Sequence, residues 1–511
     1  MKHLLIIYPH WHPVNLAGVH RPRLVGNYLK DFNWKPVVVT VLPKYFEENP
    51  DPDFIKTFSS DFEVHRVKAF KITRPRIIGD IGLRAFFHLY RKAKKITQEQ
   101  KIDFIWIPIP SFYTSLLGRI LYSKTKIPYG IDYIDPWVRD ISTRNDWRHR
   151  LSNALARFLE PIAVKKASLI TGVSEGYYLP VLERNFLREV NSEGVKREEV
   201  NSETEGEVKS EGVNSETEGE VKSGEVKSEG VNSETGREVK SEGVKSGEVK
   251  SEGVNSEKNN KIENTFSPLT SHASHFTSHD SQPFTIHHTA FPYGFDPKDH
   301  EIQLSDIQYP WSEGKEVIPW IYAGAFLPNS RIFVEVLFRA IRELKTKNEW
   351  NESIKLYFIG TGSYPGKRIT EFAEQAGISE IVVEDRSRYP FLHILNFLSA
   401  SDTVMVIGST EKHYTASKVY QALLSKRPVW AVFHEGSSAV RVLQECKADD
   451  YLVRYSDSML KEQLLAEIKK AIQSRLQSTK WHPDLKALNK YSAKASARKL
   501  VEVMEFVLSE K

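Results

Sequence analysis

The sequence predicts an open α/β fold with two parallel sheets, and three observations support this prediction. Short apolar runs alternate with longer helical patterns over residues 1–187, and the same alternation begins again after residue 285. The apolar runs are continuous, as in strands that are buried on both faces of a parallel sheet. A segment without aromatic residues separates the two regions. We therefore expect two Rossmann-like domains that face a cleft, with a long disordered low-complexity insertion between them.

Each expected element follows from this alternation. In the first region the strands are 3–8, 36–42, 102–108, 127–134 and 167–173, with helices ending near Asp31 and covering 111–124 and 150–166. In the second region the strands are 284–290, 317–324, 355–360, 380–385, 402–408 and 428–433, with helical stretches between them. The expected domains are 1–187 as the first Rossmann-like domain, 188–285 as insertion and linker, 286–485 as the second Rossmann-like domain, and a C-terminal helix over 486–511 that packs back on the first domain.

The composition excludes several classes of protein. The 511 residues include 10 Trp, 21 Tyr and 26 Phe, which is too aromatic for a fully disordered or fibrous chain. No apolar run approaches the ~18 residues of a membrane span or forms a signal peptide, so we expect a cytoplasmic protein. The single cysteine, Cys446, excludes an internal disulfide and a multi-thiolate metal site.

The charge is distributed unevenly along the chain. Residues 191–260 repeat variations of VNSETEGEVKSEG and carry 18 acidic and 10 basic residues, so they cannot bury enough surface to order themselves. The remaining chain has 61 basic and 48 acidic residues. This excess suits anionic small molecules, phosphorylated ligands or an anionic membrane, and charge alone does not choose among them.

Two polar patterns contain residue types that can bind a metal ion. His272, His275 and His279 would share one face of a helix, but the surrounding Pro, Ser and Thr argue against a helix there. Asp51 and Asp53 lie in a Pro-rich stretch that indicates a solvated loop. We therefore expect no metal site.

Residues 71–95 carry eight Lys or Arg against one Asp, with Phe86, Phe87 and Tyr90 among them. This pattern fits an amphipathic helix on an anionic membrane surface. It equally fits a solvated basic helix face, and both interpretations stay open.

Two glycine-containing loops are candidate anion sites. Gly18 follows the first strand and permits a close backbone approach, and Arg21 adds charge at the start of the next helix. The alternative is a loop glycine beside solvated arginines. Gly360 and Gly362 begin a turn that partly fits a nicotinamide-cofactor fingerprint, so an NAD-dependent oxidoreductase is one alternative function. Pro365 inside this turn weakens that fit.

The most informative stretch is 402–433, where a buried strand, a polar loop, a helix and another buried strand follow one another. Lys418 and Gln421 begin the helix, where a cation and an amide can hold a diphosphate and a ribose. The stretch resembles the donor motif of GT-B glycosyltransferases of the retaining family-four type, which build cell-surface glycans and exopolysaccharides. Lys418 falls on the motif's Lys, Gln421 on its ribose-binding Glu, and Pro428 and Val429 on its closing pair.

The resemblance extends over both regions, and it includes departures from the family pattern. Further matching segments, in order, are 21–40, 132–137, 165–176, 291–296 and 322–331. In the last segment the family uses an Arg and, six residues later, a Lys for the donor diphosphate; here Ala325 and Arg331 stand at these positions. His413 replaces an earlier Glu of the motif, and Lys426 replaces its Gly.

The resemblance implies transfer of a sugar from a nucleotide-diphosphate sugar to a hydroxyl of a glycan or lipid-linked acceptor, with retention. It implies no metal, no further cofactor and no nucleic-acid partner, and it allows peripheral binding to an anionic membrane. The expected catalytic residues are Arg331, Lys418 and Asp135, the donor site Gly324, Gly360, Gly362, Tyr389, His413, Ser417 and Gln421, and the acceptor side Gly18 and Arg21.

Alternatives remain for both the site and the function. Asp132 and Asp135 are also explained as residues that cap and turn the end of a strand. Because the motif has lost its acids and one cation, a GT-B-shaped scaffold that binds without turnover is the main alternative to an enzyme. The sugar, the nucleotide base and the acceptor stay open.

Overall fold

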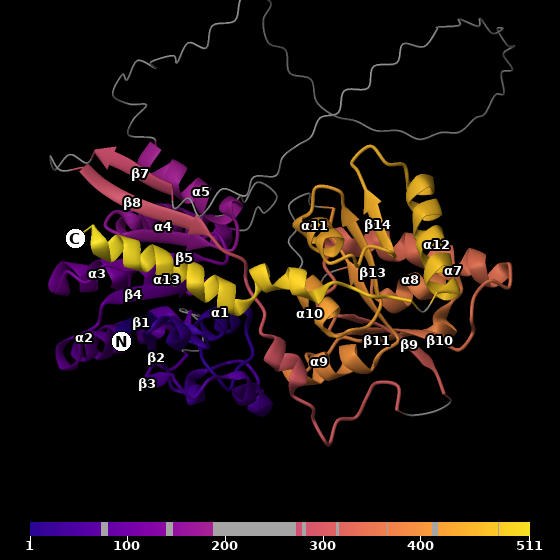
Figure 1. The fold of residues 1–511 in the computed structure, drawn as a ribbon, viewed down its shortest axis with the longest axis horizontal. Coiled ribbons are helices and arrows are strands. Elements are labelled where there is room, and N and C mark those ends of the chain that lie inside the picture. Colours follow the sequence, from indigo (N-terminus) through magenta and orange to yellow (C-terminus); the bar gives the residue numbers. More distant parts are fainter. Residues whose placement is uncertain are drawn as a thin grey trace, which may run out of the picture. The chain divides into compact units, whose positions relative to one another are not determined.

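The computed structural model describes residues 1–72, 80–138, 147–187, 272–277, 283–312, 316–364, 366–410, 417–478 and 480–510. The insertion expected at 191–260 lies outside the described residues, and so does His279. Met1–Glu193 and Ser271–Lys511 belong to one compact unit. Their described residues contain two sheets with helices packed against them (Figure 1), which confirms the predicted α/β architecture.

The first sheet has eight strands in the order β3-β2-β1-β4-β5-β6-β8-β7, and all neighbouring pairs are parallel except β8 and β7. The strands are β1 (Lys2–Ile7), β2 (Trp34–Val41), β3 (Glu63–Val67), β4 (Phe104–Ile109), β5 (Tyr129–Tyr133), β6 (Leu169–Gly172), β7 (His272–Thr277) and β8 (Pro283–Ala290). Five of them correspond to the strands expected in the first region.

One prediction about this sheet is wrong. The sequence pattern places the run 284–290 in the second domain, whereas β8 pairs with β6 in the first sheet. Periodicity identifies a strand but does not identify its partner, which explains the error. His272 and His275 lie in β7, which agrees with the expectation that no helix forms around them.

Helices cover both faces of the first sheet because its strands are apolar on both sides. The helices are α1 (Ala17–Gly26), α2 (Ile81–Glu99), α3 (Ser115–Thr125), α4 (Trp147–Val164) and α5 (Glu175–Leu182). Leu5 and Ile7 pack on one face with α2, α3, α4 and α5. Leu4 and Ile6 point to the other face, where α1 and the C-terminal helix α13 (Ala493–Ser509) pack together (Figure 1).

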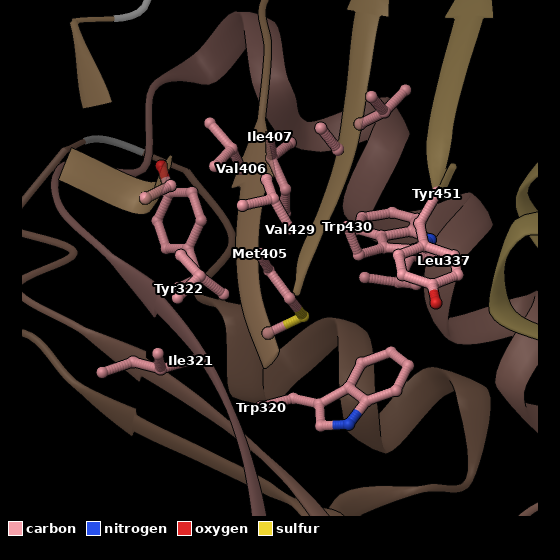
Figure 2. Packing of buried hydrophobic residues seen from close by; sticks show 14 of the residues in the cluster. Trp320, Ile321, Tyr322, Leu337, Met405, Val406, Ile407, Val429, Trp430 and Tyr451 are labelled. Carbon is pink, nitrogen blue, oxygen red and sulfur yellow. The ribbon is translucent and has the colours of Figure 1, made fainter. Parts of the chain in front are cut away.

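The second sheet has six parallel strands in the order β11-β10-β9-β12-β13-β14. They are β9 (Ile318–Ala323), β10 (Ile354–Ile359), β11 (Val382–Asp385), β12 (Thr403–Ile407), β13 (Val429–His434) and β14 (Leu452–Tyr455), with helices α7 (Arg331–Thr346), α8 (Ile369–Ala376), α9 (Phe391–Ala400), α10 (Lys418–Leu424), α11 (Ser438–Glu445) and α12 (Lys461–Gln477). Figure 2 shows the Met405 side chain of β12 pointing toward Trp320 of β9 in the buried core.

The strand order fixes where a ligand would enter each sheet. In the second sheet β10 and β12 flank β9 on opposite sides, so the chain reverses its direction of travel there. Such a switch point leaves a crevice at the carboxyl ends of the adjacent strands β9 and β12. The loop that begins at Gly324 and the first turn of α10 meet at this edge, and they carry several predicted site residues.

Candidate functional site

Lys418 lies directly against the end of β9. Its Nζ donates a hydrogen bond to the Tyr322 hydroxyl at 3.2 Å and lies 4.7 Å from the centre of the Tyr322 ring. Gly324 has φ +127°, and a Cβ at this position would lie 2.5 Å from Nζ of Lys418. The predicted residues Gly324 and Lys418 are therefore neighbours, and the glycine makes room for the lysine.

Gln421 follows one helical turn after Lys418, and it is held by a residue that the motif does not contain. His300, in the short 3-10 helix Pro297–Glu301, contacts the Gln421 side-chain oxygen with its Nε2 at 2.6 Å. Burial lowers the pKa of His300, so the ring is neutral near pH 7 and donates from Nε2. The sequence carries no signal for His300, since no spacing rule links it to Gln421.

Lys418 and Gln421 line one cavity of about 80 Å³ at the switch point. The other lining side chains are apolar and come from the end of β9, from α9 and from β12: Ala323, Phe391, Ile394, Leu395, Leu398, Val404, Met405 and Val406. A cation and an amide beside an apolar wall suit a ligand with an anionic group, hydroxyls and a flat ring.

Arg331 lines a different pocket. It is the first residue of α7 and packs against Gly366, which has φ +98° and whose Cβ would lie 2.3 Å from the guanidinium. This pocket is strongly cationic, because Lys367, Arg368 and Arg386 also line it with Thr361, Gly362, Tyr364, Phe326 and Glu384. The structure thus places the two predicted cations at the first positions of two helices, α7 and α10, and in two different pockets.

Gly360 and Gly362 form the turn after β10 with φ values of +74° and +75°, and the turn is tied to the end of β11. The Gly360 N–H donates to the Asp385 carbonyl at 2.8 Å. Tyr389 donates its hydroxyl to Oδ2 of Asp385 at 2.6 Å, and burial together with this contact raises the pKa of Tyr389 to about 12.

Internal hydrogen bonds also engage Glu384 and Asp385, which end β11, where a dinucleotide-binding fold would place the acid that holds the cofactor ribose. Glu384 accepts from the Thr361 hydroxyl at 2.7 Å and from the Thr370 N–H at 3.3 Å. Asp385 accepts from Tyr389 and from the Ser387 N–H. Both carboxylates already hold parts of the protein, which disfavours the NAD alternative, in which one of them would hold a cofactor ribose. Of the two remaining donor candidates, Ser417 precedes α10 with an exposed side chain, and His413 is outside the described residues.

Gly18 and Arg21 are not exposed to an acceptor, contrary to the prediction. The Tyr8 hydroxyl fills the space over Gly18, where a Cβ would lie only 1.8 Å away. Arg21 is fully buried and pairs with both Asp132 oxygens at 2.9 and 3.1 Å. It also donates to the Phe291 and Pro292 carbonyls. The sequence pattern could not distinguish a buried structural arginine from a ligand-binding one.

Asp135 is half-buried beyond the end of β5, in a region with several acidic and phenolic groups. Burial is the main cause of the raised pKa of Tyr8, and the negative charges of Asp80, Asp135 and Glu48 raise it further. His10 lies 3.5 Å from Glu48 and its hydrogen bond holds the pKa of that carboxyl at about 2. His10 is the third residue after β1, so the rule that sites form at strand ends could have identified it.

Asp51 is buried rather than solvated, which corrects the sequence interpretation of its loop. Its Oδ2 accepts from the Phe391 N–H at the start of α9 at 2.7 Å. Asp53 instead pairs with Lys56 at the surface. Across the described part of the chain, no three His, Cys, Asp or Glu residues gather in a way that could hold a metal ion. Nor does any helix described there combine the length and apolarity needed to cross a bilayer.

Comparison with solved structures identifies the fold. Anabaena HepE in complex with UDP and glucose matches with 11% identity over 99% of this chain and 100% of that chain, at a TM-score of 0.50. A UDP-forming trehalose-phosphate synthase from Burkholderia xenovorans matches with 10% identity over 99% of both chains, also at 0.50. The N-terminal domain of trehalose-6-phosphate phosphatase from Candida albicans reaches 0.52 with 11% identity over 99% of both chains.

The sequence itself matches no protein-family model and no curated protein. At identities near 10% the likeness to solved structures establishes the architecture, which is the GT-B fold that the donor motif predicted.

Proposed function

We propose that this protein transfers a sugar from a nucleotide-diphosphate sugar to a hydroxyl acceptor. The observation that carries the proposal is the placement of Lys418 and Gln421 on one apolar cavity at the switch point of the second sheet. Solved proteins with the same fold hold UDP or a UDP-sugar, as in HepE with UDP and glucose and the E. coli protein bound with UDP-2-fluoro glucose. Uridine nucleotides are therefore the first ligands to test.

The proposed chemistry depends on charge at the leaving group. When the bond between the sugar and the diphosphate breaks, negative charge builds up on the diphosphate, and a fixed cation stabilises the transition state more than the bound substrate. Lys418 is the candidate for this role, since Tyr322 and Gly324 fix its position. Arg331 and the cations around it would add positive potential from the adjacent pocket.

Gln421 would contact the ribose, and the acceptor would approach from the first sheet. Asp135, with Tyr8, His10 and Glu48 near the end of β1, offers carboxylates and an imidazole that can orient a sugar hydroxyl and take up its proton. Retention of configuration and a role in cell-surface glycan synthesis belong to the proposal through the family resemblance.

Incubation with a panel of UDP-, GDP- and ADP-sugars tests the proposal. We expect nucleoside diphosphate release with at least one donor in the presence of a hydroxyl acceptor, and Lys418→Ala should abolish most of it. Saturable binding of a nucleotide sugar without release would instead favour the scaffold alternative. Absence of both binding and release across the panel would refute a nucleotide-sugar site.

A further inference from the structure

The outer face of α4 carries a continuous row of large apolar side chains. Trp147, Leu151, Leu155, Phe158 and Ile162 are between 40 and 68% exposed. Their spacing places all five within about 80° of one another around the helix, at about 100° per residue. Scattered exposed apolar residues are normal, but a row in helical register is a contiguous apolar surface.

The inner face of the same helix is already used by the core. Ala156 and Ala163 are buried and pack with the strands of the first sheet. Glu160 is buried and accepts hydrogen bonds from Arg184, with an Oε2 to guanidinium distance of 2.9 Å. The exposed row therefore does not contribute to the packing of α4 on its own sheet, and the fold does not require these residues to be apolar.

The charges beside the row have one sign. Arg150, Arg157 and Lys165 are exposed on or directly after α4, and the sequence adds Arg148. Glu160 is the acidic residue of the helix, and its burial and pairing remove it from the exposed surface. Arg150 and Arg157 flank one side of the apolar row, which is the pattern of a helix that lies in the interface of an anionic bilayer.

We propose that α4 is a membrane-docking surface that inserts Leu151, Leu155, Phe158 and Ile162 among the lipid chains while its cations contact anionic headgroups. The absence of exposed acids on the described side chains of α4 favours an anionic lipid surface over an apolar protein groove. This proposal stands apart from the glycosyltransferase assignment, because vesicle binding requires no turnover.

The helix α2 (Ile81–Glu99), which overlaps the basic segment 71–95, is less suited to this role. Its apolar residues Ile81, Ala85, Leu89 and Ala93 are buried in the core of the first domain. Phe87, by contrast, is 65% exposed, which nearly equals the 68% of Phe158. Phe87 therefore provides a matched control: an equally exposed phenylalanine on a basic helix that lacks an apolar row.

Site-specific labelling tests the proposal on the full chain. The single native cysteine, Cys446, is buried, so Leu155→Cys and Phe87→Cys can each carry one environment-sensitive fluorophore. Vesicles of phosphatidylglycerol with phosphatidylcholine should shift the emission of the Leu155 label to shorter wavelength and leave the Phe87 label nearly unchanged. Vesicles of phosphatidylcholine alone should give a much weaker shift, and added salt should reduce it.

Co-sedimentation with the same vesicles gives the energetic test. Leu151→Gln/Phe158→Gln should lower the partition coefficient by at least about tenfold, because two large apolar side chains no longer enter the lipid. Arg150→Gln/Arg157→Gln should weaken binding to anionic vesicles only, and Phe87→Gln should have no effect. Unchanged melting temperatures would show that all variants fold.

Three results would overturn the proposal. The first is equal shifts from the two labels, and the second is full binding by Leu151→Gln/Phe158→Gln. The third is a wild-type protein that binds neither kind of vesicle but forms a dimer in sedimentation velocity, while Leu151→Gln/Phe158→Gln stays a monomer. In that case a second copy of the chain, rather than lipid, covers α4.

Discussion

His300 donates a hydrogen bond from Nε2 to the side-chain oxygen of Gln421 over 2.6 Å. Because the amide oxygen accepts from His300, the amide NH2 points elsewhere and is the donor that Gln421 can offer to a ligand in the cavity. A carboxylate at this place, as in the family motif, would instead accept hydrogen bonds from ribose hydroxyls. The pairing thus explains how a glutamine can serve in the proposed site, by donating where the family residue accepts.

Replacing His300 should weaken the binding of the nucleoside part of the ligand and leave the contacts to its phosphates unchanged. His300→Ala leaves the Gln421 amide free to rotate, so binding of uridine and of UDP should both weaken by about 0.5 to 1.5 kcal/mol, the range for one neutral hydrogen bond. Isothermal calorimetry with both ligands measures this. His482→Ala, which changes an exposed histidine, is the control. An effect on UDP without an effect on uridine would contradict the orienting role.

Lys418 should show the complementary pattern. Lys418→Ala removes the cation beside Gly324, so UDP binding should weaken by about 1.5 to 3 kcal/mol, the range for a hydrogen bond to a charged group, while uridine binding stays nearly constant. Arg331→Ala should cost less, because Arg331 lines the neighbouring pocket. Equal losses from both variants would indicate that the two cations contact one diphosphate, as the sequence alone suggested.

Gly324 offers a test of the same geometry without removing any charge. An added Cβ would lie 2.5 Å from Nζ of Lys418, and the backbone has φ +127°, which other residues rarely adopt. Gly324→Ala should therefore displace the lysine and weaken UDP binding nearly as much as Lys418→Ala. Gly377→Ala, at another positive φ on the far end of α8, should leave UDP binding unchanged. Full UDP affinity in Gly324→Ala would show that Lys418 can act from another position.

The sequence predicted the sheets and the Lys418–Gln421 spacing because both depend on local periodicity. A buried parallel strand is a run of apolar residues, and residues three apart in a helix share one face. The burial and pairing of Arg21 could not be predicted in this way, since its partner Asp132 is 111 residues away. The same holds for His300 and for β8, whose partners are set by the path of the chain between the sheets.

Acid should destabilise the protein through His12. Its Nε2 lies 2.9 Å from an Arg66 guanidinium nitrogen, so it accepts a hydrogen bond and must be unprotonated. Burial and the Arg66 charge lower the pKa of His12 from 6.5 to about 4. The unfolded chain therefore binds the proton first, and this part of the stability is complete above pH 6.5 and is lost as the pH falls toward 4.

Urea unfolding at pH 7.5 and pH 5 measures this dependence on His12. His12→Gln should lose less stability between the two pH values than the parent protein does. An identical loss in both proteins would mean that other groups carry the acid sensitivity.

The buried Arg21–Asp132 pair should make a large contribution to stability that appears only when one partner is removed. Both side chains are inaccessible, and Asp132 also accepts from the Thr171 hydroxyl at 2.6 Å. Arg21→Met leaves an uncompensated buried carboxylate, so the free energy of unfolding should fall by about 3 to 5 kcal/mol. Arg21→Met/Asp132→Leu removes both charges and should recover much of that loss. Lys30→Ala, which breaks an exposed pair with Asp61, should change urea unfolding very little. If Arg21→Met were instead as stable as the parent but bound the acceptor poorly, Arg21 would be a ligand-binding residue after all, and its buried pairing would describe only one state of the protein.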